Sequence, residues 1–191
     1  MTPATAAALF SVALLALVLL AMIVTTYNAV VAQRNRIRKA WANIDVALKQ
    51  RHDQLPNLVS AVRGVMAFER DVLEEVTQAR AAYRASDSVP AQAATSEATT
   101  QAVRHLFAVV ESYPEVKSAA NVAALQDEIA RLEDIISDRR ELYNDQVFRY
   151  NTRIQQVPAS LLATLMGWQP EPFFKADDAE REKPEVELAA G

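Results

Sequence analysis

The chain has 191 residues, of which 51% are hydrophobic and 7% aromatic, with only 3 Gly and no Cys. So few glycines leave little material for tight hairpin turns, which argues against an all-β sandwich or barrel and excludes a Gly-rich phosphate loop. The absence of Cys excludes disulfides, thiolate zinc sites and a catalytic thiol. The net charge is −4, but residues 27–63 carry +5 and residues 169–191 carry −4.

An apolar run near the start of the chain predicts a membrane anchor. Ala6–Val24 is apolar except for Ser11, and as a helix it would span roughly 28 Å, close to the hydrocarbon core of a bilayer. A cleaved signal peptide is the alternative, but residues 1–5 carry no Lys or Arg and the run is longer than a signal core. We therefore expect a short N-terminus over residues 1–5 and a single transmembrane helix over residues 6–26.

The anchor is followed by a cluster of basic residues: Arg34, Arg36, Arg38 and Lys39. No cation precedes the apolar run, so the positive-inside rule predicts an external N-terminus and a cytoplasmic remainder. These four side chains are also candidates for contact with anionic lipid. The alternative is that they form only the solvated face of a helix.

Apolar residues after the anchor recur at helical spacing. A stripe from Val30 to Leu55 predicts that the first helix ends before Pro56, and a second helix follows to Tyr83. The segment 85–100 is small, polar and interrupted by proline, which predicts a loop. A third helix is expected up to Tyr113-Pro114.

The fourth helix, from Val122 to Val157, shows the clearest coiled-coil-like spacing and is expected to end at Pro158. The fold class predicted is all-α: an N-terminal transmembrane helix continuous with a long antiparallel four-helix bundle over residues 27–168. Residues 159–174 predict a short amphipathic or loop segment, and residues 169–191 an acidic, disordered tail. The bundle core is predicted to include Trp41, Leu132, Ile136, Tyr143 and Tyr150.

Three charged residues fall on apolar stripes: Arg34, Glu69 and Arg139. An unpaired charge removed from water costs several kcal/mol, so Glu69 and Arg139 are predicted to join a buried ion-pair or polar network. The alternative is that Arg34 lies near the lipid headgroups, while the other two pair or extend to solvent. Glu133, beside Leu132, is assigned to an exposed face.

Catalytic and metal-binding patterns are missing from the sequence. The two histidines, His52 and His105, have no Glu three residues before them, so the signature of a di-metal bundle is absent. No catalytic residue, cofactor or metal is predicted, and the protein is expected not to be an enzyme. A nucleic-acid partner is also not expected, because the basic cluster adjoins the membrane and the remainder is net acidic.

Several dipeptides resemble those of a known family. Tyr27-Asn28, Ala40-Trp41 and Pro56-Asn57 early in the chain, then Tyr143-Asn144 and Tyr150-Asn151, are similar to the sequence blocks of the LemA family of bacterial membrane proteins. The resemblance covers about residues 1–174. It implies a single-pass protein of the bacterial inner membrane with an antiparallel helical domain, and it supplies no established enzymatic activity or cofactor that could be carried over to this chain.

Two functions are compatible with these observations. The first is a non-enzymatic, membrane-anchored scaffold or adaptor that binds another membrane protein or a second copy of itself. The second is a lipid- or ligand-responsive module at the membrane surface, which would use the basic cluster at residues 34–39 and a polar core site at Glu69 and Arg139. In both cases the lipid bilayer is a partner.

Overall fold

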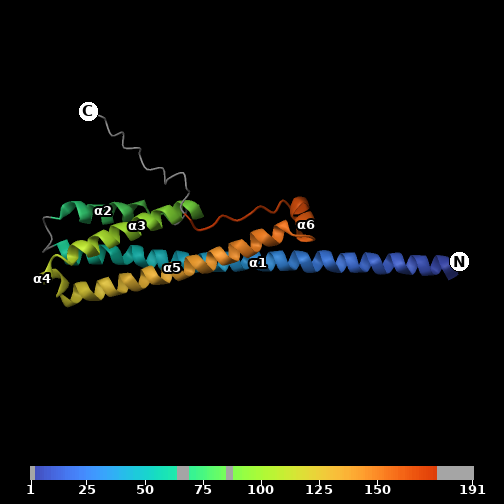
Figure 1. Ribbon diagram of the computed structural model, residues 1–191, viewed down its shortest axis with the longest axis horizontal. Helices are drawn as coiled ribbons and strands as arrows, with labels where there is room; N and C mark the ends of the chain where they lie inside the picture. The colour runs from blue at the N-terminus through green and yellow to red at the C-terminus, as the bar shows by residue number, and fades with distance from the viewer. Residues whose placement is uncertain (1–2, 64–68, 85–87, 176–191) are drawn as a thin grey trace, which may run out of the picture. The chain divides into compact units, whose positions relative to one another are not determined.

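The computed structural model describes residues 3–63, 69–84 and 88–175 (Figure 1). These residues form helices and connecting segments without a β-strand. The helices are α1 (Pro3–Arg63), α2 (Arg70–Ala82), α3 (Val89–Val110), α4 (Pro114–Lys117), α5 (Ala120–Gln155) and α6 (Ala159–Met166). The predicted all-α class is confirmed, and α1 carries both the apolar run and a bundle stripe in one continuous helix.

The chain divides into two compact units, to which α1 and α5 both contribute. The anchor unit comprises residues 1–40 and 144–171, and so includes the apolar run, the end of α5 and α6. The bundle unit comprises the described residues among 41–143 and 172–191. Within the bundle unit, the buried side chains of α1, α2, α3 and α5 form one hydrophobic core, which includes Leu55, Leu58, Val62, Val72, Val76, Val103, Leu106, Val122 and Ile129.

The helix α1 continues through Pro56, whereas the sequence predicted that it would end before this residue. Proline has no N–H, so it leaves the carbonyl of His52, four residues earlier, without its helical hydrogen bond. The guanidinium of Arg80 on α2 replaces that donor, with Nε 3.2 Å from the His52 oxygen. Burial of Leu55 and Leu58 on either side of the proline also favours a continuous helix.

The helix α3 begins at Val89, so most of the predicted loop over residues 85–100 is helical. The hydroxyl of Ser88 accepts a hydrogen bond from the N–H of Ala91 at 3.4 Å, and Pro90 lies in the first turn, where a missing N–H costs nothing. The buried face of this part of the helix is made of small or polar residues: Gln92, Ala93, Ser96, Thr99 and Thr100. The low hydropathy of these residues explains why the segment was predicted as a loop, although their spacing of three and four residues is helical.

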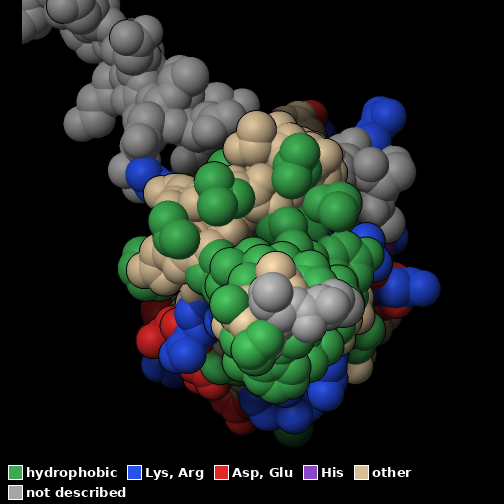
Figure 2. Space-filling view, turned by 90° about the vertical axis from the view of Figure 1, so that its right-hand side faces the viewer, with side chains coloured by type: hydrophobic (Ala, Val, Ile, Leu, Met, Phe, Trp, Pro, Cys, Tyr) green, Lys and Arg blue, Asp and Glu red, His purple; other side chains and the backbone are tan. Residues whose placement is uncertain are grey.

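The predicted short segment after Pro158 is the helix α6, which ends at Met166 and is capped by Gly167. Gly167 has φ of +66°, a left-handed conformation that glycine adopts without the penalty of a Cβ. This turn allows the N–H of Trp168 to donate to the carbonyl of Ala163 at 3.0 Å. Figure 2 shows hydrophobic side chains gathered on the face that includes the N-terminal part of α1 and α6.

Residues 169–175 are packed against helices, although the sequence assigned them to the disordered tail. In the anchor unit, the side chain of Asn151 donates to the Glu171 carbonyl at 3.0 Å and accepts from the Glu171 N–H at 2.9 Å. In the bundle unit, Phe174 is 1% exposed and its ring lies 5.9 Å from that of Trp41. Side-chain amides and aromatic burial anchor this segment, and neither is visible in its composition. Residues 176–191 of the predicted tail lie outside the described residues.

Candidate functional site

A buried arginine joins three helices of the bundle unit. Arg51 on α1 is 3% exposed, and its Nη1 lies 2.6 Å from Oε1 of Glu133 on α5. The same nitrogen donates to the hydroxyl of Thr100 on α3 at 2.9 Å, and Nη2 donates to the hydroxyl of Ser96 at 3.0 Å. The Thr100 hydroxyl in turn donates to the second oxygen of Glu133 at 2.7 Å. We call these four residues the Arg51 network.

The Arg51 network is satisfied internally, which determines what it can do. The guanidinium is matched by a carboxylate and two hydroxyls, so its desolvation is compensated by charge-assisted hydrogen bonds. Each contact requires a particular offset of α1 against α3 and α5. The network therefore fixes helix register, and it presents no unpaired group to a ligand.

A second polar group lies between α1 and α2. The hydroxyl of Tyr83 donates to Asp45 at 3.2 Å, and burial together with this carboxylate raises the pKa of Tyr83 to about 12. The ring of His52 lies 5.2 Å from that of Tyr83, and its buried Nδ1 has no hydrogen-bond partner. Burial, assisted by the charge of Arg80, lowers the pKa of His52. A neutral histidine beside a protonated tyrosine is a packing arrangement without a nucleophile.

The structure does not bring Glu69 and Arg139 together. Glu69 accepts a hydrogen bond from the hydroxyl of Tyr113 at 2.7 Å, and this bond raises the pKa of Tyr113. Arg139 is exposed on α5, and the neighbouring Arg140 faces inward, 5.2 Å from the ring of Phe174. The prediction that Glu69 and Arg139 form a buried pair is therefore wrong. Between Ile136 and Tyr143, the residue of α5 that faces the interior is Arg140 and not Arg139.

The basic residues after the apolar run are all exposed, but they differ in their surroundings. Arg34 forms an ion pair with Glu171 at 3.1 Å, so its charge is partly neutralised within the anchor unit. Arg36 donates to the Gln33 side chain at 3.4 Å, while Arg38 and Lys39 lie on the open face of α1. Of the four, Arg36 lines a groove in the anchor unit.

That groove lies between α1 and the end of α5 in the anchor unit and has a volume of about 460 Å³. Three arginines line it: Arg36 on α1, and Arg149 and Arg153 on α5. Phe148 and Val157 add exposed apolar surface to the same groove. We call it the basic groove, and its mixture of cations and apolar surface suits an amphipathic anion.

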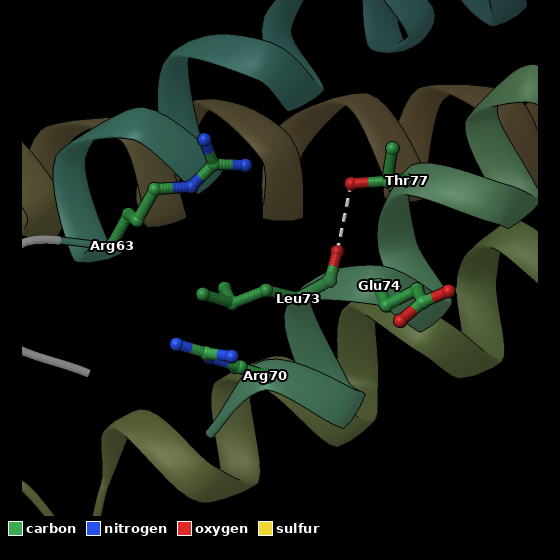
Figure 3. A pocket seen from close by; sticks show the side chains of 5 residues that line it. All are labelled: Arg63, Arg70, Leu73, Glu74 and Thr77. Carbon is green, nitrogen blue, oxygen red and sulfur yellow. Dashed lines mark hydrogen bonds between the residues drawn. The ribbon is translucent and has the colours of Figure 1, made fainter. Parts of the chain in front are cut away.

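A second hollow, of about 440 Å³, lies beside α2 in the bundle unit (Figure 3). Figure 3 shows Arg63 and Arg70 near Leu73, with the carboxylate of Glu74 directed away from Leu73. The hydroxyl of Thr77 donates to the Leu73 carbonyl at 2.8 Å, so it is engaged within α2. Residues 64–68, which connect Arg63 to the following segment, lie outside the described residues, and we assign no function to this hollow.

The predicted core residues lie as follows. Leu132 and Ile136 are buried in α5, as are Tyr143 and Tyr150. Trp41 is partly buried and packs against the ring of Tyr143, with centroids 5.7 Å apart. Both tyrosine hydroxyls donate to backbone carbonyls of the segment after α6, which satisfies their polar ends.

The sequence interpretation missed Arg51 and Glu133 as a pair. Arg51 lies three residues after Leu48 and four before Leu55, on the stripe itself, so spacing carried the signal. Glu133 was assigned to an exposed face, whereas it is partly buried and bound to Arg51. Among residues 3–63, 69–84 and 88–175, no group of three His, Asp or Glu side chains could hold a metal ion.

The helix α1 is long and apolar enough to cross a membrane, with a mean hydropathy of 2.9 in its most apolar window and none of that window buried. Together with the helical bundle, this defines the class: a membrane-anchored, all-helical protein. The chain belongs to the LemA family, which matches residues 40–188, and the predicted family is confirmed.

The chain is similar to three magnetosome proteins. It is 24% identical over 186 residues to magnetosome proteins MamQ 1 and MamQ 2 of Paramagnetospirillum magneticum, covering 84% of this chain and 68% of each relative. It is also 24% identical over 174 residues to magnetosome protein MamQ of Magnetospirillum gryphiswaldense, covering 78% of this chain and 64% of the relative. These relatives support a membrane-associated helical protein.

Proposed function

We propose that the protein is a non-enzymatic, membrane-anchored helical scaffold that binds partner proteins or a second copy of itself. The Arg51 network is the observation that carries this proposal. It uses the polar side chains in the centre of the bundle unit to hold α1, α3 and α5 in one register, which suits a rigid body that presents its outer faces. A catalytic role would require polar side chains that are free to contact a substrate, whereas those of the Arg51 network are bonded to one another.

Two exposed apolar side chains give the proposal a place to be tested. Val46 on α1 is 57% exposed and Leu142 on α5 is 51% exposed, and both belong to the bundle unit. An exposed apolar side chain is removed from water when a partner covers it, which favours binding by roughly 25 cal/mol per Å² of apolar surface. We expect one or both to contact a protein in the membrane-bound state.

Site-specific crosslinking tests this contact. The chain has no cysteine, so Val46→Cys and Leu142→Cys each introduce a single thiol. We expect a bifunctional thiol reagent applied to intact membranes to give discrete crosslinked products from these variants. Ser137→Cys, an exposed position on another face of α5, is the matched control and should remain uncrosslinked. If neither apolar position gives more product than Ser137→Cys, the scaffold proposal fails.

We further propose that the N-terminus is external and the remainder cytoplasmic, in a bacterial inner membrane. Support comes from the cations at residues 34–39 directly after the apolar run, with none before it. In intact cells, a membrane-impermeant maleimide should label Ala4→Cys, whereas Ser137→Cys should be labelled only after permeabilisation. The opposite pattern would reverse the orientation.

The second candidate function, a lipid-responsive surface module, retains one favourable observation. Its polar core site is lost, because Glu69 and Arg139 are not partners. The basic groove remains, and it combines one member of the predicted basic cluster with two arginines of α5.

A further inference from the structure

The basic groove lies at the level where the apolar run ends. Thr26, two residues after Val24, is one of its lining residues. The next residue, Tyr27, packs against Trp168, with ring centroids 5.9 Å apart. Tyr and Trp concentrate at the boundary between hydrocarbon and headgroups, so this ring pair marks the interface. The mouth of the groove therefore opens beside the headgroups of the bilayer that α1 crosses.

The helix α6 presents an apolar surface at the same level, because Trp168 directly follows its C-terminal turn. Leu161 is 66% exposed and Leu165 is 79% exposed, whereas Leu162 faces inward. Residues 154–170 carry no charged side chain, in a chain with 23% charged residues. A short uncharged helix with exposed leucines beside a membrane anchor is suited to the boundary between headgroups and acyl chains.

The charge of the anchor unit favours an anion. This unit contains six Lys or Arg and two Asp or Glu, a net of +4, whereas the whole chain has a net charge of −4. Both acids are already paired: Glu171 with Arg34, and Asp145 with Arg149 at 2.9 Å. Among the described residues, no carboxylate pairs with Arg36 or Arg153, so two guanidiniums of the groove retain their full charge.

We propose that the basic groove binds the phosphate-bearing headgroup of an anionic membrane phospholipid. The guanidiniums of Arg36, Arg149 and Arg153 contact the phosphate oxygens, since the planar fork of arginine matches phosphate geometry. Phe148 and Val157 contact the start of the acyl chains, and the exposed leucines of α6 rest in the same leaflet. The basic groove and α6 thus give the protein a second contact with the bilayer, in addition to the transmembrane helix.

Native mass spectrometry of the full chain in detergent micelles tests this site. The probes are dioleoylphosphatidylglycerol, dioleoylphosphatidylcholine and inorganic phosphate, each titrated separately. We expect one phosphatidylglycerol molecule to bind at least about tenfold more tightly than phosphatidylcholine, given roughly 1 kcal/mol per arginine near an anionic headgroup. The double variant Arg149→Gln/Arg153→Gln should lose this preference.

The matched control is Arg104→Gln/Arg139→Gln, which removes two exposed arginines from the bundle unit and should keep the preference. Circular dichroism should show the same helicity for both double variants, because all four side chains are exposed. Equal binding of the two lipids by the unaltered chain would overturn the proposal. An equal loss in both double variants would also overturn it, by showing a response to net charge alone. Displacement of the lipid by equimolar inorganic phosphate would instead indicate a site for a free anion.

Discussion

Arg51 links α1, α3 and α5 of the bundle unit through a buried guanidinium. Replacing it with leucine removes the donor to Oε1 of Glu133 and to the hydroxyls of Ser96 and Thr100, while Oε2 of Glu133 keeps its hydrogen bond from Thr100. Breaking a buried pair from one side costs about 3–5 kcal/mol. We expect the cost of Arg51→Leu to lie near the lower end of this range, because the Glu133 side chain is 21% exposed and can reach water. Chemical denaturation of the full chain in micelles, followed by circular dichroism, measures this loss.

Two further variants distinguish a pair effect from general damage. Arg51→Leu/Glu133→Leu should recover part of the loss, since no unpaired charge then remains in the core. Arg139→Leu, at an exposed position, should change the free energy of unfolding by no more than about 0.5 kcal/mol. Additive effects of the two network substitutions would show that Arg51 and Glu133 are not coupled.

His52 makes the stability of the bundle unit depend on pH. Its pKa is lowered by burial and by Arg80, with Asp53 opposing, so the unfolded chain takes up a proton at higher pH than the folded chain. The stabilising contribution is therefore present above about pH 6.5 and is lost as pH falls through the lower folded value. We expect a lower free energy of unfolding at pH 5.5 than at pH 7.5.

The variant His52→Gln isolates this contribution from that of the carboxylates. Protonation of Asp and Glu also destabilises folded proteins toward acid pH, so a pH dependence of the unaltered chain alone is not diagnostic. The difference between pH 7.5 and pH 5.5 should be smaller in His52→Gln. An unchanged difference in His52→Gln would contradict the prediction.

The comparison of Arg139 with Arg51 shows what spacing predicts and what it does not. Helical periodicity identified Leu132, Ile136, Tyr143 and Tyr150, and the structure buries all four. Ile136 and Tyr143 are seven residues apart, however, and the residue between them that faces the core can lie three or four positions after Ile136. Only tertiary packing decides that this residue is Arg140 and not Arg139. The partner of Arg51 lies 82 residues later in the chain. No local pattern specifies a contact at that separation.

At the scale of helices, the continuity of α1 through Pro56 depends on α2. Because Arg80 donates to the carbonyl that Pro56 leaves free, Arg80→Leu should cost about 1–3 kcal/mol, the usual penalty for an unsatisfied polar group that is partly buried. Pro56→Ala restores the backbone N–H. The cost of Arg80→Leu should therefore be smaller in the Pro56→Ala chain, as measured by a double-mutant cycle on the free energy of unfolding.

Equal costs in the two backgrounds would show that Arg80 acts only through packing. Sequence rules wrongly ended the helix before Pro56, because they could not supply the hydrogen-bond donor from α2. The same limit applies to α3, where Ser96 and Thr100 were assigned to a loop. A hydropathy scale counts these residues as polar and therefore as exposed, whereas their hydroxyls accept hydrogen bonds from the buried guanidinium of Arg51.

At the scale of the whole molecule, we expect the indole of Trp168 to reside at the edge of the acyl chains. The chain has two tryptophans, so Trp41→Phe leaves Trp168 as the only indole. In liposomes whose lipids are brominated near the top of the acyl chains, fluorescence of this variant should be strongly quenched. Trp168→Phe leaves Trp41, which packs against Tyr143 and Phe174, and should be quenched much less. Equal quenching of the two variants would contradict the prediction that α6 lies at the membrane interface.

The distance along the chain between Arg51 and Glu133 has a consequence for biosynthesis. At about 5–20 residues per second, roughly 4–16 s separate the synthesis of the two partners, which are 82 residues apart. During that interval the nascent chain holds α1 in the membrane with a charged residue on an uncovered apolar stripe. Emergence of α5 supplies the carboxylate and covers the stripe in the same step. We therefore expect the bundle to close only after the last long helix has been made, and a chain truncated before residue 133 to remain open to chaperones and proteases.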